Sequence, residues 1–211
     1  MSLFTRNAPA ARSAAPAAGR TAVDVFDAPT AAVTDISGDY TLDASHSRLG
    51  FSARHAMVTT VRGQFGEFAG TAKVDTTTPA NSSVSLTITT ASIDTGNADR
   101  DGHLASGDFF DAETFPELTF ASTKVERRGV DVWVITGDLT IKGISRSVSI
   151  EFESTGSAVD PYGNLRIGFE GGTTINRKDW GLTWNAALET GGVLVSDKIK
   201  LDFDISAIRN A

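Results

Sequence analysis

The 211-residue chain carries a formal net charge of -7 at pH 7, contains no cysteine, and has 40% apolar and 21% charged residues. The acidic balance argues against a nucleic-acid partner, whose phosphates require a basic surface, and against general adsorption to anionic lipid. The lack of cysteine excludes disulfides, thiolate nucleophiles and cysteine metal ligands, and the composition is typical of a soluble globular protein.

The N-terminal part of the chain, residues 1–37, is rich in Ala, Pro, Ser and Thr and shows no sustained hydrophobic period. This composition predicts a flexible tail. No apolar run approaches the ~20 residues that span a bilayer, so we expect no stable membrane insertion. The first residues contain arginines but no continuous apolar segment of the secretory type, which predicts a cytoplasmic location. Export to the periplasm is the alternative if a leader is missing.

From residue 38 onward, apolar and polar residues alternate with the period of two that half-buried β-strands show. Val84, Leu86 and Ile88 give a clear example. Further alternating runs cover 47–55, 61–75, 118–126, 130–141, 145–154, 165–175 and 198–205. Gly63, Gly66 and Gly70 lie inside one of them, where glycines are typical of bulges or sharp bends that curl a sheet.

Two segments break the alternation. The first, 98–116, combines charges with phenylalanines and fits a short helix capped by Asn97 or Asp99, after which Phe115-Pro116 enforces an extended backbone. The second, 178–192, allows another short helix. Short turns between the alternating runs favour antiparallel neighbours. The pattern therefore predicts an all-β domain over 38–211, an extended antiparallel β-barrel of about eight strands with one or two short helical insertions, in preference to a sandwich.

A barrel of eight strands is wide enough to hold one small ligand, or is filled by its own side chains. The apolar faces are compatible with both. As a ligand wall they would bind a long apolar chain, because each CH2 removed from water contributes about 0.8 kcal/mol. As a packed core they would leave no room for it.

Several segments resemble the YceI family of lipocalin-like lipid-binding proteins. They are YTLD at 40–43, HS at 46–47, FSARH at 51–55, TVRGQF at 60–65, RDGHL at 100–104, DFFD at 108–111, FPELTF at 115–120, GDLTIKG at 137–143 and INRKDWGL at 175–182. They occur in the family's order from residue 38 to the C-terminus. The resemblance implies a lipocalin-like barrel with a long apolar tunnel that holds a polyisoprenoid, such as an isoprenoid quinone, or a similar fatty amphiphile. It also makes a homodimer plausible.

The candidate ligand-binding residues are aromatic side chains of the tunnel wall and polar groups near its end. We expect the wall to include Phe51, Phe65, Phe109, Phe110, Phe120, Trp133, Phe169, Trp180 and Trp184, and His55 to point inward at the tunnel end. Arg54, Arg100 and His103 are expected to bind the ligand's head group, because a phosphate or hydroxyl requires hydrogen-bond donors near the mouth. Surface ion pairs with neighbouring aspartates are the competing interpretation of these three.

No pattern in the sequence favours catalysis. His46, His55 and His103 form no metal-binding motif, no GxSxG elbow is present, and the glycine pairs are not phosphate loops. We therefore expect a carrier without catalytic residues, metal or cofactor. Two alternatives stay open: a lipid-modifying enzyme with His103 and Asp101 as the base pair, and a ligand-free interaction barrel with residues 1–37 as its arm.

Overall fold

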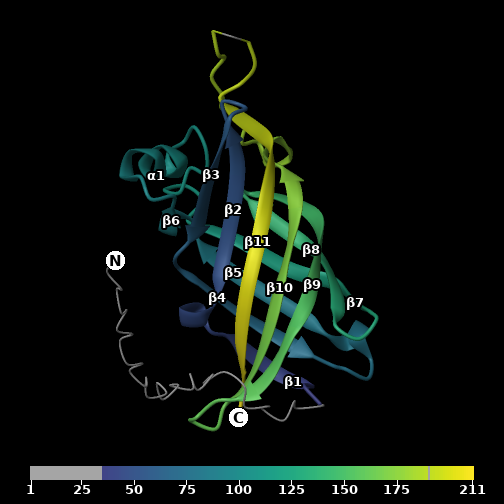
Figure 1. Cartoon of the computed structure of the whole chain (residues 1–211). Helices are drawn as coiled ribbons and strands as arrows, with labels where there is room; N and C mark the ends of the chain where they lie inside the picture. Colours follow the sequence, from purple (N-terminus) through teal and green to yellow (C-terminus); the bar gives the residue numbers. More distant parts are fainter. Residues whose placement is uncertain (1–34, 190) are drawn as a thin grey trace, which may run out of the picture. The chain divides into compact units, whose positions relative to one another are not determined.

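The computed structural model describes residues 35–189 and 191–211, in which strands form a closed antiparallel barrel (Figure 1). The ring consists of β1 (Gly38–Leu42), β4 (Phe68–Val74), β5 (Ser83–Thr89), β7 (Glu117–Arg128), β8 (Val132–Ile141), β9 (Ile144–Val159), β10 (Leu165–Asn176) and β11 (Val195–Arg209), in that order. Pairing of β1 with β11 closes it. The expected eight-stranded barrel is confirmed.

Three more strands extend one side of the barrel. β2 (Arg48–His55) pairs with β11, β3 (Thr59–Phe65) pairs with β2, and the two-residue β6 (Ile93–Asp94) pairs with β3. Helix α1 (Ala98–Ala105) follows β6 and lies beside it at the same end of the barrel (Figure 1). We call the end that carries α1, the turn at 56–58 and the segment 181–194 the upper end, and the end that carries β1 and the turn at 160–164 the lower end.

Alternation along the strands decides which side chains face inward. In β11 the outward positions hold Lys198, Lys200, Asp202 and Asp204, whereas Ile199, Leu201, Phe203 and Ile205 line the interior. A strand places successive side chains on opposite faces, so this sequence can bury its apolar side only against the inside of the ring. The predicted period-two pattern is therefore the direct cause of the barrel wall.

Some expected elements differ from the structure. The run 61–75 is two strands, β3 and β4, separated at Gly66 and Glu67. Strand register shifts occur at Gly168/Phe169, Ser122/Lys124 and Val195/Ile199 and not at the glycines of that run. The segment 178–192 does not form a second α-helix. It contains the 3-10 helix η4 (Arg177–Trp180) and then continues without helix to an isolated bridge between Ala187 and Val193.

The N-terminal boundary also differs. The predicted tail falls mostly on residues 1–34, which lie outside the described residues. The three that follow contact the barrel: the Tyr40 hydroxyl donates to the Ile36 carbonyl at 2.7 Å, and the hydroxyls of Ser37 and Thr76 lie 2.8 Å apart. Tyr40 is fully buried, so the ordered domain begins before residue 38.

Helix α1 begins as its sequence predicts. The Asn97 side chain accepts a hydrogen bond from the Arg100 amide at 2.9 Å, which satisfies one of the free amides of the first turn. Asn97, and not Asp99, is thus the N-cap. No residue of α1 is fully buried, so the helix is held at the barrel by partial contacts only.

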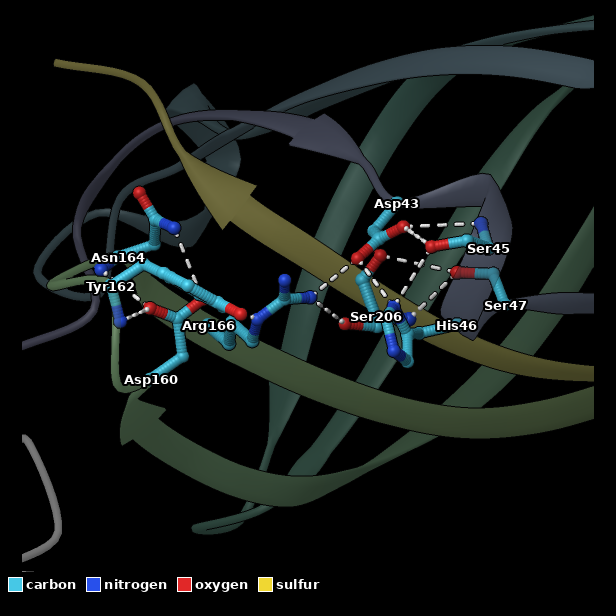
Figure 2. A network of polar contacts seen from close by, with 9 residues as sticks. All are labelled: Asp43, Ser45, His46, Ser47, Asp160, Tyr162, Asn164, Arg166 and Ser206. Atoms are coloured by element: carbon cyan, nitrogen blue, oxygen red, sulfur yellow. Dashed lines mark hydrogen bonds and ion pairs between the residues drawn. The ribbon is translucent and has the colours of Figure 1, made fainter.

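A polar network fixes the lower end, where β1 turns into β2 through the 3-10 helix η1 (Ala44–His46) (Figure 2). Arg166 of β10 binds Asp43 through one guanidinium nitrogen and Asp160 through another, the latter at 2.9 Å. Asp43 also accepts hydrogen bonds from Ser45 and lies 2.8 Å from Nδ1 of His46. One arginine therefore joins the β1–β2 corner to the β9–β10 turn.

The two carboxylates of this network are stabilised in their charged form. The hydrogen bond from Arg166 holds the pKa of Asp43 well below its usual range, with a smaller contribution from Ser45. Burial raises the pKa of Asp160, but the hydrogen bonds from Asn164, Arg166 and Tyr162 together outweigh it and lower that pKa to about 2. A carboxyl whose pKa is lower in the folded chain contributes stability above its unfolded pKa and loses it as the pH falls toward the folded value.

We expect Arg166→Met to lower the free energy of unfolding at about pH 7 and to weaken its dependence on pH. In the wild-type chain this free energy should fall as the pH is lowered from about 5 to about 2, because Asp43 and Asp160 take up protons in the unfolded chain while they stay charged in the folded chain. Without Arg166 the decline should be shallower. Urea unfolding at several pH values measures both effects.

The matched control is Arg48→Met, which removes an ion pair with Asp202 whose side chains are 42% and 36% exposed. Exposed pairs contribute little, so its unfolding free energy should stay close to that of the wild type. Equal pH profiles for wild type and Arg166→Met would contradict the role assigned to the network.

Candidate functional site

The barrel encloses a cavity of about 560 Å³. Its wall extends from Val84 and Val74 near the lower end to Leu194 and Val195 at the upper end. The inward faces of the barrel strands supply most of it, and α1 contributes Asp99, Arg100, His103 and Leu104, which lie on one face of the helix. The side chains thus do not meet at the centre, and the barrel has room for a ligand.

Twelve of the thirteen candidate residues are part of this wall. They are Phe51, Arg54, His55, Phe65, Arg100, His103, Phe109, Phe110, Phe120, Trp133, Phe169 and Trp184. Their contact with a ligand stays a prediction. Trp180 is the exception: it is 2% exposed, does not line the cavity, and its indole nitrogen donates to the Leu139 carbonyl at 2.9 Å. It packs in the core that supports the wall, so its assignment as a ligand contact is wrong.

The wall is almost entirely apolar. Among the described residues that line it, the charged ones are Arg54, Lys73, Asp99, Arg100 and Arg177. A pocket of this kind favours an apolar ligand and orients it through few polar groups.

The three expected head-group residues already have partners in the protein. Arg54 donates to the carbonyls of Met57 and Val58 at 2.9 and 3.1 Å. Arg100 donates to the hydroxyl and the carbonyl of Thr95 at 2.7 and 2.9 Å. His103 Nε2 lies 3.1 Å from Asp108. All three border the cavity, but the first two primarily hold backbone, so their predicted role in head-group binding requires that they exchange partners.

Phenylalanines lie flat on the wall because glycines face them. Phe51 in β2 pairs directly with Gly63 in β3, and a Cβ on Gly63 would lie 2.4 Å from the Cζ of that ring. Phe152 covers Gly171 in the same way. A glycine under a ring lets the ring lie along the strand instead of projecting into the lumen. These pairs widen the cavity while keeping its surface aromatic.

At the upper end, α1 and the loop after it meet the segment 181–194 through three rings. His103 contacts Trp184 edge-on with centroids 4.6 Å apart and Phe109 edge-on at 5.1 Å, and Phe109 lies 5.2 Å from Trp184. The Lys142 ammonium holds the same loop by donating to the carbonyls of Gly107 and Phe109 at 2.9 and 3.0 Å. These aromatic contacts close part of the upper end over the cavity.

Arg177 is a residue of the site that the sequence reasoning did not single out. It is 3% exposed, and its guanidinium donates to the carbonyls of Ser196 at 3.1 Å, Leu182 at 2.6 Å and Trp184 at 2.8 Å. Burial lowers its pKa and the charge of Asp197 raises it. The INRKDWGL segment could have indicated this role, since an arginine that begins a short helix beside aromatic residues can donate hydrogen bonds to the carbonyls of a neighbouring loop. Arg177 positions Trp184 over the cavity.

Two arrangements that catalysis could use are not formed among the described residues. Within residues 35–189 and 191–211, no three His, Asp or Glu side chains cluster so that they could hold a metal ion. His103 pairs with Asp108, whereas Asp101 accepts from the Thr95 amide at 2.9 Å, so the base pair that the enzyme alternative requires is not formed. No helix among the described residues has the length and apolarity to cross a bilayer.

Comparison with known proteins identifies relatives over most of the chain. The YceI-like domain model matches residues 40–207. A UPF0312 protein of Shewanella sp. strain ANA-3 is 34% identical over 175 residues, which are 82% of this chain and 88% of that protein. A UPF0312 protein of Photorhabdus laumondii is 38% identical over 147 residues, 69% of this chain and 76% of that protein.

Solved structures have the same fold. The crystal structure of Burkholderia cenocepacia BcnA has a TM-score of 0.69 at 26% identity and covers 78% of this chain and 98% of its own. The Campylobacter jejuni YCEI protein has a TM-score of 0.65 at 30% identity, over 75% and 90% of the two chains. A polyisoprenoid binding domain from Saccharophagus degradans, with a TM-score of 0.61 at 19% identity, covers 81% of this chain and 98% of its own, and shows a likeness of fold alone.

We expect Gly63→Ala to narrow the cavity with little loss of stability. The added Cβ would meet only side-chain atoms of Phe51 and Thr95, so the Phe51 ring should swing into the lumen. Nile red uptake should fall, while the unfolding free energy should change by less than about 1 kcal/mol. In Gly63→Ala/Phe51→Leu, uptake should recover.

Gly171→Ala is the contrasting variant, because its Cβ would lie 2.4 Å from the Glu151 carbonyl oxygen, which is backbone. Overpacking against backbone should cost about 1–3 kcal/mol of unfolding free energy. Unchanged uptake in Gly63→Ala would contradict the proposed arrangement of the ring.

We expect Arg177→Lys to destabilise the chain by about 3 kcal/mol, since one ammonium cannot reach the three carbonyls that the guanidinium binds. Hydrogen exchange should accelerate in 181–189. Lys178→Met is the control, because Lys178 forms an exposed ion pair with the same Asp197 and its loss should cost under about 1 kcal/mol. Similar losses of unfolding free energy in the two variants would contradict the role assigned to Arg177.

Proposed function

Because this chain belongs to the YceI-like family, whose model matches residues 40–207, we propose that it is a soluble carrier that sequesters a long-chain isoprenoid or a related amphiphile in its barrel. The hollow, apolar interior is the observation that carries this proposal. A filled barrel would have excluded it.

The energetics suit a long hydrocarbon. Each CH2 moved from water into an apolar environment contributes about 0.8 kcal/mol, so ten buried methylenes contribute about 8 kcal/mol before the costs of binding are subtracted. The cavity of about 560 Å³ lies within the usual range for small-molecule sites. Its few polar groups lie mainly at the upper end, which favours an amphiphile whose polar end remains there.

The relatives support the same class of ligand. The Saccharophagus degradans domain, which has this fold, is described as polyisoprenoid binding. We transfer that property to this chain as a proposal, and an isoprenoid quinone belongs to the same class. The assignment as a non-enzymatic carrier without cofactor, the cytoplasmic location and the homodimer stay predictions.

We expect native mass spectrometry of gently purified protein to detect a bound hydrophobic molecule that organic extraction removes. Ala53→Trp should lower its occupancy severalfold without lowering the melting temperature, because Ala53 faces the lumen between Val61 and Ile199. The control is Ala121→Trp, an exposed position on β7 that should leave occupancy unchanged.

Empty protein after gentle purification, together with failure to take up added polyprenol, would refute the carrier function. An equal loss of lipid in Ala53→Trp and Ala121→Trp would show that the lipid is bound outside the barrel.

A further inference from the structure

The upper end of the barrel exposes aliphatic side chains on two adjoining tips. Met57 is 63% exposed, Val58 75% and Val193 40%; we call these three residues the apolar tip. The turn at 56–58 and the segment 181–194 adjoin, because the Ala56 amide donates to the Leu194 carbonyl at 2.7 Å. Figure 1 shows both tips at the top of the barrel. Leu194 and Val195, which follow Val193 in the sequence, line the cavity.

The turn that carries Met57 and Val58 is strained. Ala56 and Met57 have φ angles of 49° and 61°, in the left-handed region where turns of this kind usually place Asn and Gly. The guanidinium of Arg54 holds the conformation by binding the carbonyls of Met57 and Val58. A strained backbone that is held in place so as to present two apolar side chains to solvent indicates a binding role.

Basic residues lie below the apolar tip on the outer face of β2, β3 and β11, and one of them, Arg54, also borders the cavity. Arg54, Arg62, Lys198 and Lys200 are all exposed, and we call them the basic belt. The strand register aligns them, since Lys200 pairs with Ser52 and Ser52 with Arg62. Farther down β11 the outward residues change sign to Asp202 and Asp204.

Among the described residues, none of the four members of the basic belt forms an ion pair with a carboxylate. The nearby Asp197 is already bound to Arg177 and Lys178. The net charge of -7 therefore conceals a local cationic surface beside the cavity. At the same end, α1 and its loop, which follow β6 beside β3, expose Asp99 and Asp108.

We propose that the upper end docks on a lipid bilayer with anionic head groups. The apolar tip inserts among the head groups, and the basic belt binds their negative charge. The amphiphile can then pass between bilayer and cavity without crossing water. This transfer rests on the proposed carrier function, whereas docking does not.

The chemistry of the ligand gives the reason for docking. Each methylene lowers the equilibrium concentration of a chain in water about fourfold, so a long amphiphile is almost absent from the aqueous phase. A carrier loads efficiently only where it contacts the phase that holds its ligand. An apolar rim beside the cavity, flanked by cations, matches the surface of an anionic bilayer.

The test is flotation of the full chain with vesicles of phosphatidylcholine alone and of phosphatidylcholine with about one quarter phosphatidylglycerol. The chain should bind the anionic vesicles at least about tenfold better, and added salt should weaken that binding. Lys198→Glu/Lys200→Glu should lower the binding about tenfold. Lys124→Glu/Arg128→Glu, which changes the net charge equally on exposed positions of β7, should not.

The apolar tip is tested separately. Met57→Ser/Val58→Ser should lower vesicle binding several-fold, whereas Val159→Ser/Tyr162→Ser, at exposed apolar positions of the lower end, should leave it unchanged. Thermal melts of all variants confirm that they fold. Equal binding to both kinds of vesicle, or equal losses in test and control pairs, would overturn the docking surface.

Native mass spectrometry of the same samples separates the two proposals. Protein that carries lipid but does not float with anionic vesicles overturns docking and leaves the carrier function intact. Protein that docks but neither contains nor accepts a polyprenol overturns the carrier function and leaves the docking surface standing.

Discussion

The barrel depends on the backbone hydrogen bonds along one edge of β11. Strand β10 pairs with the opposite edge along nearly the whole strand. The edge in question is shared by two strands, because Asp204 pairs with Arg48 of β2 and Ala207 pairs with Leu42 of β1. The change of partner would leave Ser206 without strand hydrogen bonds. Its amide instead donates to the Ser47 hydroxyl at 2.9 Å, and its carbonyl accepts from the Asp43 amide at 2.8 Å. Since unpaired backbone groups are costly, this corner determines where β1 ends, and with it the closure of the ring.

Closure alone does not decide whether the interior is hollow. Eight strands give a ring that large side chains could fill. In this chain phenylalanines that could have met across the lumen lie over glycines of the neighbouring strand, as Phe51 does over Gly63 and Phe152 over Gly171. The barrel is therefore lined with aromatic surface and still has room inside.

The sequence predicts the wall better than the ends. Period-two alternation is a local property, so the strands and the all-β class could be predicted, and Asn97 is one of the two caps expected for α1. The sequence could not show that Trp180 is buried in the core without lining the lumen, because its position depends on the 3-10 helix that carries it. It could not show the contacts of Arg177 or Ser206 either, since their partners are decided by the folded topology. The expected helix over 178–192 is limited to the turn of η4, because Gly181 has a φ of 72° and ends it.

Three arginines stabilise the two ends of the barrel through hydrogen bonds and ion pairs. Arg166 joins two carboxylates at the lower end, whereas Arg177 and Arg54 bind backbone carbonyls of loops at the upper end. A planar guanidinium can donate to several acceptors at once, which a lysine ammonium cannot do with the same geometry. Carboxylates at the lower end make that junction strong and charge-paired. At the upper end the acceptors are mainly neutral carbonyls, and Arg177 also binds the carboxylate of Asp197. The acidic chain thus holds the loops around its cavity mainly through its own backbone carbonyls.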